Sequence, residues 1–365
     1  MAYRLALATL AATCVLMLLG GLVTNTGAAL AVPDWPSTFG YNMVLFPWSR
    51  MVGGIFYEHS HRLMGALVGL LTLTLAALLW REGGRLRRLG LIAVAVVLAQ
   101  GVLGGLRVVL LENTLAIVHG SLAQAFFALL AAIALLTAPR GRVAGVRVEP
   151  ALKGLTVLAA ALVYAQIVFG ALLTHTGRID LHLGGAVLVF AIVPIVTAPL
   201  RRTGDAVAAP VSRLLLVLLG AQLLLGVGSF LARFSPFWIP GEQLGGVALP
   251  VAHRLVGSLI LAAIVILSVR VHTVNAEPER VDQAPRSHAA SVSGHPRSEP
   301  ASRTPSPTSP RRICLRPLSI RTGRRTEPGR VFLRPPSVRA GLEAPARKKY
   351  PVSQAARTST VRPRS

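Results

Sequence analysis

Long runs of Leu, Ala, Val and Gly fill the first 272 residues and are separated by short polar connections. None of the runs alternates apolar and polar residues, as the strands of a membrane barrel do. A helix rises 1.5 Å per residue, so about 20 apolar residues cross the roughly 30 Å hydrocarbon core of a bilayer. Eight windows meet this requirement: 5–23, 60–80, 89–111, 114–138, 154–174, 182–200, 214–231 and 248–271. The pattern predicts an all-α polytopic membrane protein with eight transmembrane helices.

Residues 273–365 differ in composition from the first 272, because they are rich in Pro, Ser, Thr and Arg and have no apolar periodicity. They hold 14 of the 25 prolines and cannot bury enough apolar surface to fold alone. We expect a disordered basic tail. Three interpretations stay open: an arm attracted to anionic lipid, a solvated extension without a site, and translation of a GC-rich gene past its proper stop.

Composition and charge narrow the class of protein. Of 365 residues, 53% are apolar and 14% charged, which excludes a soluble globular protein, whose charged fraction is usually about 25%. The net charge of +24 does not indicate nucleic acid binding, because 19 basic and 6 acidic residues belong to the tail. The two cysteines, Cys14 and Cys314, supply no disulfide framework and no thiolate metal site.

Arg and Lys gather in every second connection, and this asymmetry predicts orientation because positive charge favours the cytoplasmic side. The connections after the second, fourth and sixth windows hold Arg81, Arg85, Arg87, Arg88, Arg140, Arg142, Arg147, Lys153, Arg201, Arg202 and Arg213. The opposite connections hold one each: Arg50, Arg107, Arg178 and Arg233. We expect a multi-pass protein of the cell (inner) membrane with both termini cytoplasmic, the first window being a retained span and not a cleaved signal peptide.

An internal repeat divides the predicted body. The segment 20–27, GGLVTNTG, is echoed by 170–177, GALLTHTG, and His61-Arg62 of the second window is echoed by His253-Arg254 of the eighth. Such duplication is common in membrane proteins. It predicts an N-terminal four-helix half, 1–138, and a C-terminal four-helix half, 139–272.

Four histidines lie near the start of the even-numbered windows: His61, His119, His182 and His253. All even-numbered spans run inward, so the four imidazoles are expected at one depth near the outer face. Ionisable residues within a membrane are costly and usually functional. One such histidine could equally be an interfacial residue, but four at matching positions favour two sites, each with a pair of ligands.

A pair of imidazoles suits haem iron, because a porphyrin fills the other four positions. Zinc would need four converging ligands, often with carboxylate or thiolate help that the body hardly offers. Arg62 and Arg254 directly follow two of the histidines and are candidate partners of haem propionates. Gly120, Gly184 and Gly185 are expected to let a flat macrocycle approach the backbone.

Glu58 lies three residues before His61, on the same helical face. It is a candidate general acid or base at a haem edge, or only a charge favoured by a helix N-terminus. His59 cannot share the face of His61 and is expected, like His175, to be a loop or interfacial residue. Three glutamines on odd-numbered spans are expected to form interhelical hydrogen bonds: Gln100, Gln166 and Gln222.

Several motifs resemble one family in their order and spacing over residues 5–270. They are GGLVT at 20–24 with VPDWP at 32–36, EHSHR at 58–62, QGVLGG at 100–105, His119, His182 with Gly184 and Gly185, and His253-Arg254. The chain resembles the haem A synthases, eight-helix membrane enzymes that convert haem O to haem A for cytochrome oxidase. Many bacterial members carry a cysteine pair around the PDWP segment, where this chain has Val32 and Ser37-Thr38.

The resemblance implies an oxidoreductase that oxidises the C8 methyl group of haem O to a formyl group. It implies that His61 and His119 hold the substrate haem, that His182 and His253 hold a haem b, and that Glu58 takes part in catalysis. Implied partners are haem O, the farnesyltransferase that makes it, an unidentified electron donor and membrane lipid, with a homo-oligomer left open and no nucleic acid. The alternatives are a diheme b-type electron-transfer subunit without its own chemistry and a transporter without haem.

Overall fold

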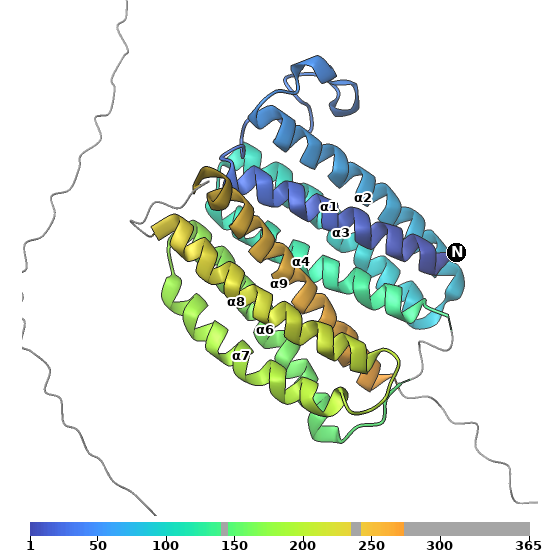
Figure 1. Cartoon of the computed structure of the whole chain (residues 1–365). Coiled ribbons are helices and arrows are strands. Elements are labelled where there is room, and N and C mark those ends of the chain that lie inside the picture. Colours follow the sequence, from blue (N-terminus) through green and yellow to red (C-terminus); the bar gives the residue numbers. More distant parts are fainter. Residues whose placement is uncertain (140–144, 235–241, 274–365) are drawn as a thin grey trace, which may run out of the picture. The chain divides into compact units, whose positions relative to one another are not determined.

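The structure, a computed structural model, describes residues 1–139, 145–234 and 242–273. The predicted tail lies outside these ranges except for its first residue, Thr273. Arg140 and Arg142 also lie outside them. Eight helices are long and apolar enough to cross a membrane, and no strand occurs in the described ranges (Figure 1). They are α1 (Ala2–Asn25), α2 (Gly54–Glu82), α3 (Gly84–Leu110), α4 (Asn113–Leu136), α6 (Pro150–Thr176), α7 (Ile179–Leu200), α8 (Ala208–Phe234) and α9 (Glu242–His272). The prediction of an all-α polytopic membrane protein is confirmed.

All eight of these helices begin before the predicted windows, but α3 ends at Leu110 and α4 at Leu136, just short of the predicted ends. Hydroxyl groups inside the spans find partners within their own helix, as an apolar environment requires. Thr9, Thr13, Thr72 and Thr197 each donate to the carbonyl four residues earlier. Glycine ends two of the helices: Gly83, at φ +72°, joins α2 to α3, and Gly177, at φ +76°, follows α6.

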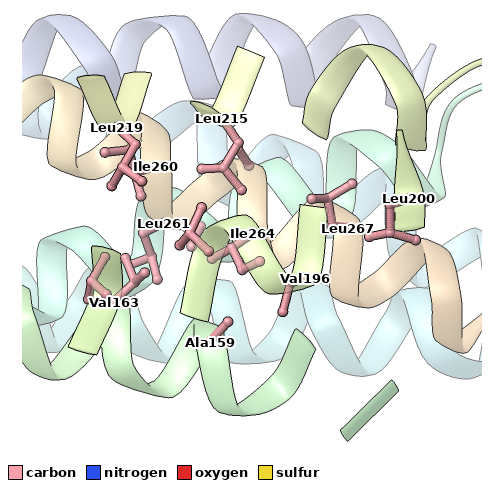
Figure 2. Packing of buried hydrophobic residues seen from close by; sticks show 14 of the residues in the cluster. Ala159, Val163, Val196, Leu200, Leu215, Leu219, Ile260, Leu261, Ile264 and Leu267 are labelled. Carbon is pink, nitrogen blue, oxygen red and sulfur yellow. The ribbon is translucent and has the colours of Figure 1, made fainter. Parts of the chain in front are cut away.

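Buried apolar side chains form two main clusters. One lies within α1–α4 and includes Leu75, Leu79, Leu130 and Ile133. The other lies mainly within α6–α9, and Figure 2 shows its members from all four of these helices. A smaller cluster around Phe127 of α4 and Ala262 of α9 connects the two sets of helices. The division of the body at residue 138 stays a prediction.

Two helices are more enclosed than the others. Within the most apolar window of each span, 50% of α4 and 56% of α9 is buried, against 11–33% for the other six. Both helices also contact α1 and α6 as well as each other. We call α4 and α9 the inner helices, and each of them carries one of the four histidines.

A buried ion pair ties α9 to the connection before α8. Arg270 donates from Nη2 to Asp205 Oδ2 at 2.6 Å and from Nε to Oδ1 at 3.1 Å. The Asp205 carboxylate also accepts the N–H groups of Val207 and Ala208 at the start of α8. Both charges are thus paired and hydrogen-bonded, which offsets the cost of burying them.

Candidate functional site

The structure brings the four histidines together as two pairs. His61 of α2 faces His119 of α4, with ring centroids 6.5 Å apart and ring planes inclined by 77°. His182 of α7 faces His253 of α9, with ring centroids 6.1 Å apart and planes inclined by 68°. Each pair therefore combines one histidine of an inner helix with one of a more exposed helix, and the two pairs have nearly the same geometry.

A glycine of the preceding helix lies against each imidazole. The contacts join Gly20 to His61, Gly104 to His119, Gly170 to His182 and Gly226 to His253. A Cβ atom on these glycines would stand 3.0, 3.3, 3.3 and 3.1 Å from the respective ring Cε1 atoms. Such distances are tight for carbon contacts, so even an alanine would press on the ring. The same local packing is used four times.

The three glutamines form the expected interhelical hydrogen bonds, and each bond goes to a histidine of the next helix. Gln100 Nε2 donates to the His119 carbonyl at 3.1 Å, and Gln166 Nε2 donates to the His182 carbonyl at 2.9 Å. Gln222 Nε2 lies 3.1 Å from His253 Nε2. This prediction is confirmed.

Gly120, Gly184 and Gly185, which the sequence predicts to admit a macrocycle, differ in the free space around them. The expectation that Gly185 admits a macrocycle is wrong, because the space above it is filled by the side chains of Gln166 and Phe169. A Cβ atom on Gly120 or Gly184 would meet no described atom within 4 Å. These two positions remain open to a flat ligand.

The donor set of each pair fits haem. In the described part of the chain, no group of three or more His, Cys, Asp or Glu side chains could hold a metal ion by itself. Two imidazoles that ligate one ion from opposite sides, with each nitrogen about 2 Å from it, have ring centres roughly 6 Å apart. The observed 6.5 and 6.1 Å match this spacing. Buried ring nitrogens without a hydrogen-bond partner, Nδ1 of His119 and Nδ1 of His253, also point to a further ligand.

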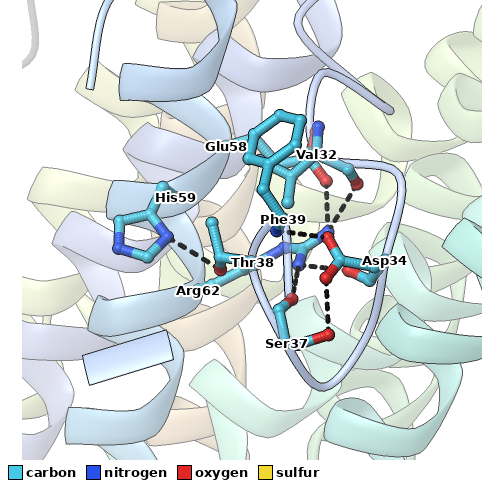
Figure 3. A network of polar contacts seen from close by, with 8 residues as sticks. All are labelled: Val32, Asp34, Ser37, Thr38, Phe39, Glu58, His59 and Arg62. Carbon is cyan, nitrogen blue, oxygen red and sulfur yellow. Dashed lines mark hydrogen bonds and ion pairs between the residues drawn. The ribbon is translucent and has the colours of Figure 1, made fainter. Parts of the chain in front are cut away.

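Glu58 is buried and anchors the connection between α1 and α2, as Figure 3 shows. Its Oε2 accepts the N–H of Val32 at 3.0 Å, and its Oε1 accepts Nη2 of Arg62 at 2.8 Å. The sequence analysis leaves two interpretations of this residue: a group that transfers protons, or a charge favoured by a helix N-terminus. The structure adds a third role, since the carboxylate holds the loop of residues 26–53. We call this segment the outer loop, after the orientation that the sequence predicts.

The Arg62 side chain also forms hydrogen bonds to the outer loop. Its guanidinium donates to the carbonyls of Val32, Asp34 and Ser37 at 2.9, 2.7 and 3.1 Å, besides the ion pair with Glu58. This sequence-predicted propionate partner thus has its donors turned to the outer loop. Arg254 donates to Thr174 Oγ1 at 3.2 Å and so connects α9 with the end of α6. For both arginines, contact with a propionate stays a prediction.

The placement expected for His59 is wrong. It lies within α2, is 1% exposed, contacts Thr38 Oγ1 at 3.2 Å and packs against Phe46, with ring centroids 5.0 Å apart. The outer loop covers it, and no periodicity in the sequence signals such a cover. His175 belongs to the last turn of α6 and is half-buried.

Asp34 organises the tip of the outer loop, although the sequence analysis assigns it no role beyond its place in the PDWP motif. Its carboxylate accepts the N–H groups of Phe39 and Gly40 at 2.7 and 2.9 Å and the hydroxyl of Ser37. Burial raises the pKa of this carboxyl, but the hydrogen bonds from Gly40, Ser37 and Phe39 outweigh it and lower the pKa to about 2. The loop therefore carries a fixed negative charge at neutral pH.

Trp35 extends the outer loop across to α3. Its indole ring lies directly on Gly105, where any Cβ atom would collide with it. Gly105 follows Gly104, which contacts His119, so the loop reaches from Glu58 on α2 to the helix behind the second histidine of this pair. Residue types alone could not reveal this contact, because the partners are 70 positions apart in the sequence.

Two comparisons with known proteins show what part of the chain is similar to. The family model described as "Cytochrome oxidase assembly protein" matches residues 41–180, which include Glu58, His61, Arg62 and His119 but not His182 or His253. A heme A synthase of Shouchella clausii (strain KSM-K16) is 32% identical over 186 residues, which is 47% of this chain. The match covers 59% of that relative's length. Part of this chain is thus similar to a family of cytochrome oxidase assembly proteins and to a heme A synthase, in agreement with the resemblance of its motifs.

Proposed function

We propose that this protein is a haem A synthase, which oxidises the C8 methyl group of haem O to a formyl group for cytochrome oxidase. The observation that carries the proposal is the presence of two histidine pairs with haem-compatible spacing in an eight-helix body related to this family. The family relation supports an oxidoreductase that acts on haem. The specific reaction is our inference.

The two pairs are assigned different haems. His61 and His119 would hold the substrate, because Glu58 and the outer loop lie beside this pair. His182 and His253 would hold a haem b, which supplies electron transfer when bound. Glu58 would hold or move a proton at its carboxylate while the methyl group is oxidised.

Further partners follow from the same proposal. Haem O must come from the farnesyltransferase that makes it. Oxidation of the methyl group to a formyl group removes four electrons, so the reaction needs an oxidant such as dioxygen. With dioxygen, each of two hydroxylations also takes two electrons from a donor that the chain does not identify, and the resulting geminal diol loses water. We place the protein in the cell membrane with both termini cytoplasmic, because basic residues gather in alternate connections.

A diheme electron-transfer subunit is the second candidate, and one observation favours it. The two pairs differ by only 0.4 Å in ring separation and 9° in ring inclination. Equivalent sites suit an electron carrier that needs no distinct substrate site. The content of the N-terminal pair separates the two functions.

The test is to purify the full chain from cells that make haem O, extract the bound porphyrins and identify them by mass. Haem O or haem A beside haem B supports the synthase, whereas haem B alone assigns the electron carrier. A preparation without any haem contradicts both. The His119→Ala variant serves as the matched control, since it should lose haem O and haem A while keeping haem B.

A further inference from the structure

One residue position recurs behind all four histidines. Each packing glycine has a residue one helical turn earlier on the same helix, and that residue contacts the same histidine. The pairs are Leu16 with Gly20, Gln100 with Gly104, Gln166 with Gly170, and Gln222 with Gly226. Three of the four positions are glutamine, and in the repeat Leu16 corresponds to Gln166.

The contacts of these four residues differ in one respect. His61 Nδ1 lies 3.2 Å from the backbone carbonyl of Leu16, to which a ring N–H donates. At the other three positions the carboxamide of a glutamine approaches the histidine. Gln166 Nε2 lies 3.2 Å from His182 Nδ1, and Gln222 Nε2 lies 3.1 Å from His253 Nε2.

The fold makes room for two of these carboxamides. A Cβ atom on Gly257, one turn after His253, would stand 3.4 Å from Gln222 Nε2. A Cβ atom on Gly185, one turn after His182, would collide with Gln166 Oε1. Glycine at these positions lets a glutamine lie along the ligand helix beside the imidazole.

Each glutamine also has an unused acceptor. The Oε1 atoms of Gln100, Gln166 and Gln222 are buried and without a hydrogen-bond partner among the described residues. A buried acceptor left unpaired costs about 1–3 kcal/mol, so three equivalent cases call for a common explanation. A metal-bound imidazole supplies one, because the ring nitrogen that does not bind the metal carries a proton and needs an acceptor.

We propose that Gln100, Gln166 and Gln222 are positioning residues for haem ligation. The side-chain oxygens of Gln166 and Gln222 accept the N–H of the ring nitrogen that does not bind iron, and the Leu16 carbonyl serves His61 in the same way. Gln100 positions His119 through its backbone carbonyl. The proposal rests on the proposed function only in requiring that the histidines bind haem. For Gln222, half a turn of the carboxamide replaces Nε2 by Oε1 at the ring and breaks only its bond to His253.

An asymmetry between the pairs follows. The C-terminal pair has a glutamine beside each ligand, whereas the N-terminal pair has Gln100 and the backbone of Leu16. A hydrogen bond to the outer nitrogen orients the imidazole and raises its basicity. Side-chain substitutions can therefore remove this support at both ligands of the C-terminal pair but not at His61, whose acceptor is a backbone carbonyl.

The experiment uses the full chain loaded with haem and compares Gln166→Leu and Gln222→Leu with the unsubstituted protein. Haem transfer to an excess of apomyoglobin measures retention, and a spectroscopic redox titration measures the midpoint potential. We expect about 10- to 100-fold faster loss of the C-terminal haem in each variant. Its potential should become more positive, because a less basic imidazole stabilises ferric iron less.

Two further variants complete the design. Leu16→Gln keeps the backbone carbonyl that accepts from His61, so it should leave the loss of the N-terminal haem unchanged. Gln124→Leu is the matched control, since Gln124 is an interhelical glutamine that bonds to Ser258 and not to a histidine, and its haem transfer should equal that of the unsubstituted protein. Gln222→Met, an unbranched replacement, stands in if Gln222→Leu does not fold.

Unchanged transfer rates and potentials in both C-terminal variants would overturn the positioning role while leaving the proposed function intact. Equal acceleration in Gln124→Leu would overturn it as well, because the effect would then be general loosening of the helices. An unsubstituted chain that never binds haem would instead overturn the proposed function, and this inference with it.

Discussion

At the scale of single residues, the carboxylate of Glu58 serves the loop and stands beside the proposed substrate pair. It accepts one backbone N–H and one guanidinium group, so its orientation is fixed from two sides. A fixed carboxylate next to a reaction centre is well placed for proton transfer, because no reorganisation is needed during the reaction. The same contacts mean that a substitution here can also disturb the outer loop.

Glu58→Gln separates these tasks. Glutamine keeps the volume and one acceptor oxygen but cannot exchange a proton in the same way. If Glu58 moves protons, the variant should bind both haems yet make about 10²- to 10⁴-fold less haem A per bound haem. Glu112→Gln, at the exposed start of α4, is the control and should keep the unsubstituted yield. A near-normal yield in Glu58→Gln would remove Glu58 from the chemistry.

The closure of the outer loop should depend on pH through Asp34. Its pKa is about 2 in the closed loop and 3.8 when its hydrogen bonds are absent. The charged form therefore stabilises closure fully above about pH 4, and this contribution is lost as the pH falls toward 2. Fluorescence of Trp35 as the sole tryptophan, with Trp48, Trp80 and Trp238 changed to Phe, should report opening over this range.

Asp34→Asn in the same single-tryptophan background is the comparison. An amide cannot accept the three hydrogen bonds as a carboxylate does, so the loop should be open at neutral pH and show no step between pH 4 and 2. A step that persists in Asp34→Asn would assign the opening to another carboxyl group.

At the scale of helices, the apolar pattern predicted all eight elements because a membrane span needs only length and composition. The outer loop could not be predicted, since its conformation depends on contacts distant in sequence. Val32 bonds to Glu58 26 residues later, and Arg62 reaches back 30 residues to the Val32 carbonyl. For the same reason the sequence predicts His59 as a loop or interfacial residue, whereas it lies in α2 and is buried beneath this loop.

The packing of a glycine against each histidine leads to a prediction about haem content for α3. Gly104→Ala places a Cβ atom 3.3 Å from His119 Cε1, so the ring must shift and the N-terminal haem should be lost or weakened. Overpacking of this kind costs about 1–3 kcal/mol. Gly101→Ala lies one turn away with no described atom within 4 Å, and should leave haem content unchanged. Haem content and thermal unfolding of both variants check this, and equal haem content would exclude a packing role for Gly104.

At the scale of the whole molecule, the sequence predicted four histidines at one depth, and the structure brings them together as two pairs. The sequence alone could not show that α4 and α9 are the inner helices. All eight spans have similar mean hydropathy, and lipid-facing and protein-facing surfaces are equally apolar. The inner position of these helices becomes visible only when buried residues such as Leu130 and Ile264 are located.

Orientation in the membrane is the remaining property of the whole molecule that the sequence predicts, from the Arg residues of alternate connections. Arg87 lies over the Trp80 ring at 5.2 Å, a pairing that suits a membrane interface at the turn between α2 and α3. If this turn is cytoplasmic, alkaline phosphatase fused after Gly84 or Gly204 should be inactive, and a fusion after Gly40 in the outer loop should be active. A cytoplasmic reporter at the same three sites provides the control, because it should give the inverse pattern. Activity after Gly84 and not after Gly40 would place all four histidines near the cytoplasmic face, and the proposed orientation would be wrong.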